Sequence, residues 1–429
     1  MFGFANFLLL ALFAAAVFDL IFALARGGGL RGALHGLWNT PHLLFGQQLA
    51  EWRLQLGRIL FAAGLAAYEI SVVFCNSMAR QNWAWVQGVM SPVLEWLAFL
   101  CFGAKILFGT RYTWRELLAG GALYFIARWV YFNSQNIWWI GIVVAVLAAK
   151  DVRLRHPLQV YFASGCAAMA VVLALHFAGI VAPDLTSERM GALRGTYGYG
   201  HPNTFGGLVF GLVLAYALLR AQKVRWVDCL LVFAVGVFLL VGPASRSAAL
   251  CTLALAVGLV FCRLRAGHSV PRWWPGTCAG MVGLTAAVSY LLPLLVIKVG
   301  PWNNDIGPAW LKAWSFNTTC RISLTWMAYR LLDVKIAGQV FNWPTVDNSF
   351  AFALFQFGPV VAALLGILFA AALWGHAKQG RRVEVCCLFA MLAYAYMEVQ
   401  PFHLTTNPTA LLLCGAVFAQ TSARWQKIE

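Results

Sequence analysis

Long apolar runs separated by short polar connections extend along almost the whole chain. A helix that crosses a bilayer needs roughly 20 mainly apolar residues, and about thirteen runs reach that length. Their centres lie near residues 12, 69, 98, 124, 142, 170, 211, 234, 254, 287, 362, 391 and 412. We read every run as a helix and none as a barrel strand. The pattern therefore predicts an all-α, polytopic membrane protein with about 12–13 transmembrane helices.

The composition agrees with this prediction. Of the 429 residues, 61% are hydrophobic and 11% are charged, and the mean hydropathy of +0.74 lies far outside the range of soluble domains. The first run, within residues 1–25, lacks a basic leading segment and a small-residue cleavage site, so we expect a retained span and not a cleaved signal peptide. We divide the chain into an extra N-terminal transmembrane segment with its cytoplasmic connection (1–50) and one polytopic core (51–429).

The charge pattern predicts which connections face which side. The net charge is +16, but the Lys and Arg residues are spread over short connections and form no dense stripe, which argues against nucleic acid as a partner. Short basic connections face the cytoplasm; here they are 150–156, 220–225, 263–272, 375–382 and the C-terminal tail. The outer connections are then 133–136, 183–202, 242–246, 300–349 and 400–408.

The 11 cysteines lie mostly inside apolar runs and show neither a disulfide framework nor metal-ligand spacing, so we expect no metal and no cofactor. In the long external loop 300–349, the spacing of Ile322, Trp326 and Tyr329, together with the tryptophans that precede them, favours short amphipathic helices in the headgroup region. An irregular covering loop is the alternative.

Two predicted helices begin at the outer surface with recognisable caps. A residue before proline avoids the α region, and proline favours the first helical position, so His201 is expected to cap a helix that Pro202 opens. In the stretch "GPASRSAAL", Ser245 can cap the following helix, with Arg246 in its first turn.

A third helix start follows Asp347, Asn348 and Ser349, all of which suit an N-cap. Three helix N-termini at one surface would attract an anion, and phosphate is the natural candidate. Glycines in this region would let the backbone turn sharply and approach a ligand closely: Gly195, Gly198, Gly200, Gly206 and Gly207. The arginines that would add to the field are Arg189, Arg194, Arg246 and Arg321.

Each candidate also has a purely structural interpretation. His201 can serve only as a cap, Arg246 as an interfacial residue that extends toward the headgroups, and Asp347 as an N-cap. Glu398, near the outer end of the twelfth predicted span, can be a structural partner for one of the arginines.

Five stretches in order carry a family resemblance: "RMGALRGTYGYGHPNTFGG", "GPASRSAAL", "CRISLTWMAYRLLDVKIAGQVF", "DNSFAFALFQFGPV" and "EVQPFHLTTNP". Together they resemble the Wzy-type bacterial polysaccharide polymerases that make capsule, exopolysaccharide or O-antigen, and more distantly the O-antigen ligases. The resemblance covers roughly residues 57–420. Each stretch alone is a weak signal, whereas five in the same order on one side of a multispan chain are fairly specific.

The resemblance implies a GT-C-like fold and a metal-independent, inverting glycosyltransferase at the outer face of the bacterial plasma membrane. Its donor is a growing glycan on undecaprenyl diphosphate, and its acceptor is one repeat unit on the same carrier. A chain-length regulator and a flippase would be its partners beside the lipid bilayer. The related ligases carry His-Asn-Ser where this chain has Asp347, Asn348 and Ser349, which favours a polymerase and leaves the identity of the base open.

We assign the expected roles as follows. The candidate catalytic base is Asp347 first and His201 second. Diphosphate binding is assigned to Arg246 and Arg321, with Arg194 and Arg189 assisting, and substrate orientation to Asn203, Asn348, Ser245 and Glu398. The nearest alternative function is an O-antigen-type ligase or another lipid-diphosphate glycan transferase. A lipid-linked oligosaccharide flippase or other transporter is less consistent with the chain, because no half is repeated and few charges lie at mid-membrane.

Overall fold

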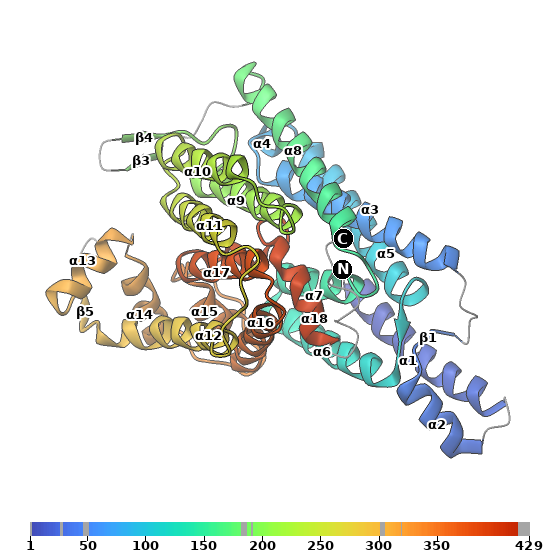
Figure 1. Cartoon of the computed structure of the whole chain (residues 1–429). Helices are drawn as coiled ribbons and strands as arrows, with labels where there is room; N and C mark the ends of the chain where they lie inside the picture. The colour runs from blue at the N-terminus through green and yellow to red at the C-terminus, as the bar shows by residue number, and fades with distance from the viewer. Residues whose placement is uncertain are drawn as a thin grey trace.

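The computed structural model describes residues 2–25, 29–45, 51–181, 187–189, 192–300, 305–318 and 320–418 (Figure 1). The helices of the first half are α1 (Phe2–Ala25), α2 (Gly29–Asn39), α3 (Glu51–Cys75), α4 (Ala79–Asn82), α5 (Ser91–Phe108), α6 (Trp114–Ser134), α7 (Ile137–Ala148), α8 (Arg155–Phe177) and α9 (Pro202–Leu219). Those of the second half are α10 (Trp226–Val241), α11 (Arg246–Leu264), α12 (Trp274–Leu291), α13 (Ala309–Asn317), α14 (Arg321–Leu331), α15 (Ser349–Phe352), α16 (Pro359–Lys378), α17 (Arg382–Met397) and α18 (Cys414–Val417).

Strands are confined to three short antiparallel pairs among the described residues. They are β1 (His42–Leu43) with β2 (Arg111–Tyr112), β3 (Ser187–Arg189) with β4 (Ala192–Arg194), and β5 (Lys298–Val299) with β6 (Asp305–Ile306). The prediction of an all-α membrane protein is confirmed at this level.

Every predicted apolar run coincides with helical structure, but the runs differ in length. In the described part of the chain, 8 helices are long and apolar enough to cross a membrane: Gly3–Ala25, Trp52–Cys75, Val86–Phe108, Arg155–Phe177, Pro202–Leu219, Arg246–Leu264, Trp274–Leu295 and Pro359–Lys378. α7, α10 and the segment Pro408–Val417 are shorter apolar helices. The chain is therefore a multi-pass helical membrane protein.

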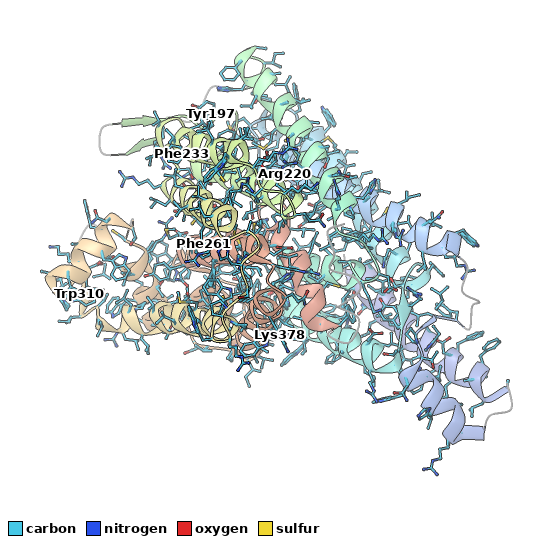
Figure 2. All side chains as sticks on the ribbon, in the orientation of Figure 1. Tyr197, Arg220, Phe233, Phe261, Trp310 and Lys378 are labelled. Atoms are coloured by element: carbon cyan, nitrogen blue, oxygen red, sulfur yellow. The ribbon has the colours of Figure 1, made fainter. Side chains whose placement is uncertain are left out.

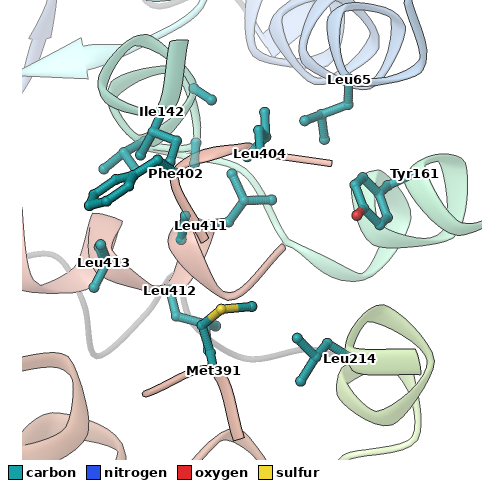
Figure 3. Packing of buried hydrophobic residues seen from close by; sticks show 14 of the residues in the cluster. Leu65, Ile142, Tyr161, Leu214, Met391, Phe402, Leu404, Leu411, Leu412 and Leu413 are labelled. Carbon is teal, nitrogen blue, oxygen red and sulfur yellow. The ribbon is translucent and has the colours of Figure 1, made fainter. Parts of the chain in front are cut away.

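The centre of the molecule is built around α7 and the C-terminal 3₁₀ turn Pro408–Leu413. Residues Trp139 to Ala148 of α7 are all buried, as in a helix enclosed by other helices on every side. In Figure 3, Ile142 of α7 and Leu411 of the turn lie among side chains from α3, α8, α9 and α17. Leu8 of α1 belongs to the same buried cluster, so the N-terminal segment packs onto the core. The predicted boundary at residue 50 falls within 46–50, which lies outside the described residues.

The outer surfaces of several helices are apolar. On α1, for example, Phe7, Leu10 and Phe13 are more than half exposed, and on α10 the same holds for Val227 and Leu230. Such surfaces suit a lipid environment, in which exposed apolar side chains cost nothing.

The predicted long loop contains two short helices, α13 and α14, as expected. They form a projection beside α12 at one edge of the bundle (Figure 1). The buried face of this pair is partly polar, since Ser315 and Ser323 share a hydrogen bond of 2.9 Å. Trp310, labelled in Figure 2, and Trp314 are 53% and 41% exposed.

The predicted helix after residue 348 is in two pieces. α15 continues into the π-helical turn Ala353–Phe357, the chain bends at Gly358, and α16 begins at Pro359. Gly358 has φ 87° and ψ 165°, a region that is essentially restricted to glycine. A Cβ at this position would lie 2.1 Å from the carbonyl oxygen of Ile336. The third helix start therefore belongs to a short helical segment that precedes the long helix α16.

We expect Gly358→Ala to destabilise the fold by about 1–3 kcal/mol, because alanine is strained at this φ and its Cβ meets backbone. The measurement is thermal unfolding of the purified protein in detergent. Gly366→Ala is the matched control in α16, where an added Cβ meets nothing within 4 Å. An equal Tm for both variants would contradict the steric argument.

Candidate active site

α9 begins as the sequence predicts. His201 is its extended N-cap and Pro202 is its first residue. The His201 Nδ1 accepts a hydrogen bond of 3.1 Å from the backbone N–H of Asn203. Because a backbone N–H can only donate, this Nδ1 carries no proton, and the neutral ring must hold its proton on Nε2. In this arrangement Nε2 is a donor and not a base.

α11 and α15 also begin at the predicted positions. Ser245 is the N-cap of α11, but its hydroxyl makes no capping hydrogen bond. At α15 the cap is Asn348, whose Oδ1 accepts from the backbone N–H of Ala351 at 3.0 Å. The Asn348 side-chain amide donates to Ser289 Oγ and to the carbonyl oxygen of Tyr396, both at 3.0 Å. Asp347, just before this cap, therefore keeps its carboxylate for other partners.

Glu398, at the end of α17, links four other segments of the chain. Its side chain is 7% exposed, and its Oε1 accepts hydrogen bonds from Arg321 Nη2 at 2.6 Å and from Asn203 Nδ2 at 3.1 Å. Ser247, in the first turn of α11, lies close enough to this carboxyl group to lower its pKa. The backbone carbonyl of Glu398 accepts from Ser349 Oγ at 2.5 Å. The starts of α9, α11, α14 and α15 are thus tied to the end of α17 through one residue.

Arg321, the first residue of α14, lies between two carboxylates. Its Nε is 3.5 Å from Asp347 Oδ2, and its Nη1 donates to the carbonyl oxygen of Thr318 at 3.0 Å. Nη1 and Nη2 therefore donate hydrogen bonds within the protein, whereas the buried Nε makes only the ion-pair contact with Asp347 and no hydrogen bond. We predicted Arg321 as a diphosphate ligand, yet its contacts suit the positioning of Asp347 and Glu398 better. The Asp347 side chain is 30% exposed and is the more accessible of the two carboxylates.

Arg194 extends the network on the other side. It is buried, and its Nη2 donates to Asn203 Oδ1 at 2.9 Å and to the carbonyl oxygen of Ala244 at 3.2 Å. The strand that carries Arg194 pairs with the strand that ends at Arg189, but the Arg189 side chain lies outside the described residues.

Arg246 differs from the other predicted arginines. It is exposed at the first position of α11, and its guanidinium makes no ion pair or hydrogen bond with any residue that the structure describes. Its neighbour in the chain, Ser247, lies close to the Glu398 carboxyl group. A cation without an internal partner therefore lies at a helix N-terminus beside the network, where an anion is favoured.

The paired glycines of α9 serve packing. A Cβ on Gly206 would lie 2.2 Å from Ser245 Oγ, and a Cβ on Gly207 would lie 1.8 Å from Gln400 Oε1. The prediction that these two glycines leave room for a ligand is wrong, because side chains of the same protein fill that space. Gly198 does make a turn, at φ 81°.

The sequence did not single out Gln400 as a site residue. Its Nε2 donates to the backbone carbonyl of Asn203 at 3.2 Å, and its Oε1 accepts from Tyr394 OH at 2.7 Å. Gln400 therefore fixes the first turn of α9 from the α17 side. The available signal was its place two residues after Glu398 in "EVQPF".

Within the network, the protonation of the buried Glu398 carboxyl group depends most on its surroundings. Burial raises the pKa of Glu398 above its ordinary value of 4.5, while the guanidinium of Arg321 and the nearby Ser247 side chain act in the opposite direction. Among the described residues, no group of three or more His, Cys, Asp or Glu side chains is placed to hold a metal ion.

Comparison of the chain with protein-family models, with curated proteins and with solved structures finds no match.

We expect Arg321→Gln to destabilise the protein by about 3 kcal/mol or more, because it leaves the buried Glu398 carboxylate without its cation. Arg246→Gln, which removes an arginine with no described partner, should leave the Tm unchanged. The measurement is thermal unfolding in detergent between pH 4.5 and pH 8.

The loss of stability that Arg321→Gln causes relative to the wild type should become smaller as the pH falls. With the pKa of Glu398 raised, the native state holds this proton more tightly than the unfolded state, and this contribution to stability is lost as the pH rises through the native pKa. Removing Arg321 raises that pKa further, so protonation relieves the variant at a higher pH than the wild type. A deficit that is constant with pH would contradict the assignment.

Proposed function

We propose that the chain is a polysaccharide polymerase that joins undecaprenyl-diphosphate-linked oligosaccharide repeat units by inverting, metal-independent glycosyl transfer. The observation that carries the proposal is the network Asp347–Arg321–Glu398–Asn203–Arg194 at one end of the bundle, beside the exposed Arg246. The order of the five sequence motifs supports the same function, since they supply these residues.

The substrate is held by its lipid and by its diphosphate. A multi-pass helical protein suits a lipid-linked donor and acceptor, both of which remain in the bilayer. The positive-inside pattern supports a plasma-membrane protein with this end of the bundle on the extracytoplasmic side.

In the proposed reaction, Arg246 binds the departing diphosphate at the start of α11, where the helix dipole favours an anion. Negative charge grows on the diphosphate as the bond to the sugar breaks, so a fixed cation stabilises the transition state more than the ground state. Arg194 and Arg321 have internal partners, so in this proposal they contribute positive potential without binding the diphosphate directly.

Asp347 is the base in this mechanism. The acceptor hydroxyl oxygen attacks the anomeric carbon from the face opposite the diphosphate, and the new glycosidic bond forms as the old carbon–oxygen bond breaks. Undecaprenyl diphosphate leaves with the electron pair, and the hydroxyl proton passes to the Asp347 carboxylate. His201 is less suited, because its Nδ1 is used by the helix cap and its Nε2 holds the proton of the neutral ring.

The residues expected to orient the substrate act mainly through the protein itself. Asn203, Asn348 and Glu398 are bonded to other residues of the chain, and Ser245 packs against Gly206. We therefore propose that they position the two reactive groups, Asp347 and Arg246.

The test of the function uses purified protein in nanodiscs with its undecaprenyl-diphosphate repeat unit, without nucleotide sugar or added metal. We expect a product ladder at repeat-unit spacing. Arg246→Ala should lower its rate by roughly 10- to 100-fold, the worth of a charge-assisted hydrogen bond to a diphosphate, whereas Arg265→Ala, at the other end of α11, should not. Transfer only to an added separate acceptor would indicate a ligase, and inertness in both assays would favour a transporter.

The same assay tests the base. Asp347→Asn should lower the rate by at least 100-fold, because the amide cannot accept the proton. Asp333→Asn, at an exposed position in the same loop, is the matched control, and His201→Ala should cost less than tenfold as a lost helix cap. Loss of activity in His201→Ala with retention in Asp347→Asn would transfer the role of base to His201.

A further inference from the structure

A charged cavity lies away from the network described above. Its volume is about 590 Å³, within the range of small-ligand pockets, roughly 300–1,000 Å³. Three stretches form it: the α9–α10 connection, the last residues of α11 with those that follow, and the start of α17 with the residues before it. Figure 2 labels one neighbouring residue for each stretch, namely Arg220, Phe261 and Lys378.

This cavity and the candidate active site lie at opposite ends of the same helices. α11 begins at Arg246, beside the network, and its other end reaches the cavity at Cys262 and Arg263. α17 runs in the reverse sense, from Arg382 at the cavity to the residue before Glu398. A 19-residue helix is about 28 Å long at 1.5 Å per residue, close to the thickness of the hydrocarbon core. The cavity therefore belongs at the other boundary of the bilayer.

Cations predominate in its lining. The charged side chains that line it are Lys223, Arg225, Arg263, Arg381, Arg382 and Glu384. The Arg382 guanidinium donates to the carbonyl oxygens of Arg265 at 2.7 Å and His268 at 2.5 Å, which keeps it at the wall.

The nearby acidic groups offset only part of this positive charge. Asp228, at the start of α10, is already paired with Arg220 at 3.1 Å. Glu384 is 6% exposed. The exposed side chains of Lys223 and Arg263 make no ion pair or hydrogen bond with any described residue.

The rim of the cavity borders apolar surface. Trp226 and Val227 at the start of α10 are 53% and 70% exposed, and Leu264 at the end of α11 is 62% exposed. A tryptophan beside exposed aliphatic side chains is typical of the headgroup level of a membrane. An amphiphile could thus place its acyl chains along these side chains and its head in the cavity.

We propose that this basic cavity binds a phosphate-bearing headgroup, and that its source is an anionic phospholipid of the cytoplasmic leaflet. Basic pockets between transmembrane helices on that side are suited to such lipids. A soluble phosphate ester would satisfy the same cations, and the experiment separates the two sources. The proposal does not depend on the reaction at the other end of the bundle.

The experiment is native mass spectrometry of the full chain in detergent, with phosphatidylglycerol or zwitterionic phosphatidylcholine added. The wild type should retain phosphatidylglycerol in preference. The double variant Lys223→Gln/Arg263→Gln should bind it roughly 10- to 30-fold more weakly, given the contribution of each cation near an anionic headgroup. The matched control Arg153→Gln/Arg155→Gln, with two exposed arginines at a different basic connection, should bind it as the wild type does.

A parallel arm adds glycerol 3-phosphate to delipidated protein and measures the Tm. A Tm rise in the wild type that the double variant lacks, without selective lipid retention, would support the cavity and assign it to a soluble ester. Equal lipid binding by the wild type and the double variant, with no Tm rise, would overturn the proposal. The proposal is also overturned if the control variant loses as much lipid as the double variant, because lipid would then bind to the basic surface in general and not to this cavity. The single variant Lys223→Gln, which changes one exposed side chain, repeats the test if the double variant folds poorly.

Discussion

A buried carboxylate at the end of α17, Glu398, holds the starts of several other helices together. Moving a charged group from water into the protein interior costs several kcal/mol unless a well-placed partner compensates for it. Glu398 obtains that compensation from Arg321, Asn203 and Ser247, which come from three other helices. The starts of these helices must therefore remain together at this surface, and the reactive groups beside them gain fixed positions.

The same interaction holds the projecting pair α13–α14 to the bundle. Arg321 opens α14 and is bonded both to Glu398 and to Asp347, so the projection cannot move away without separating the charges. Asp347 is thereby placed at the junction of the projection and the core, where it is partly exposed. The arrangement explains how a long connection between spans can carry a residue that needs an accurate position.

Local sequence signals predicted much of this, and long-range contacts account for the remainder. Apolar runs located the helices because burial and span length leave a direct pattern, and Pro202, Ser245 and Asn348 marked the helix starts because capping is local. The bend at Gly358 and the packing role of Gly206 depend on atoms far away in the chain. The sequence suggested that Glu398 pairs with one of the arginines, but that this arginine is Arg321, and that it also contacts Asp347, depends on contacts between distant segments.

The close approach of α9 to α11 has a consequence for the path of the polymer. Ser245 fills the space above Gly206 on the α11 side, so no sugar ring can pass between α9 and α11 at this point. In the proposed reaction, a glycan bound at Arg246 must extend toward Asp347 and the α13–α14 projection. The contact between α9 and α11 therefore closes one side of the site to the product.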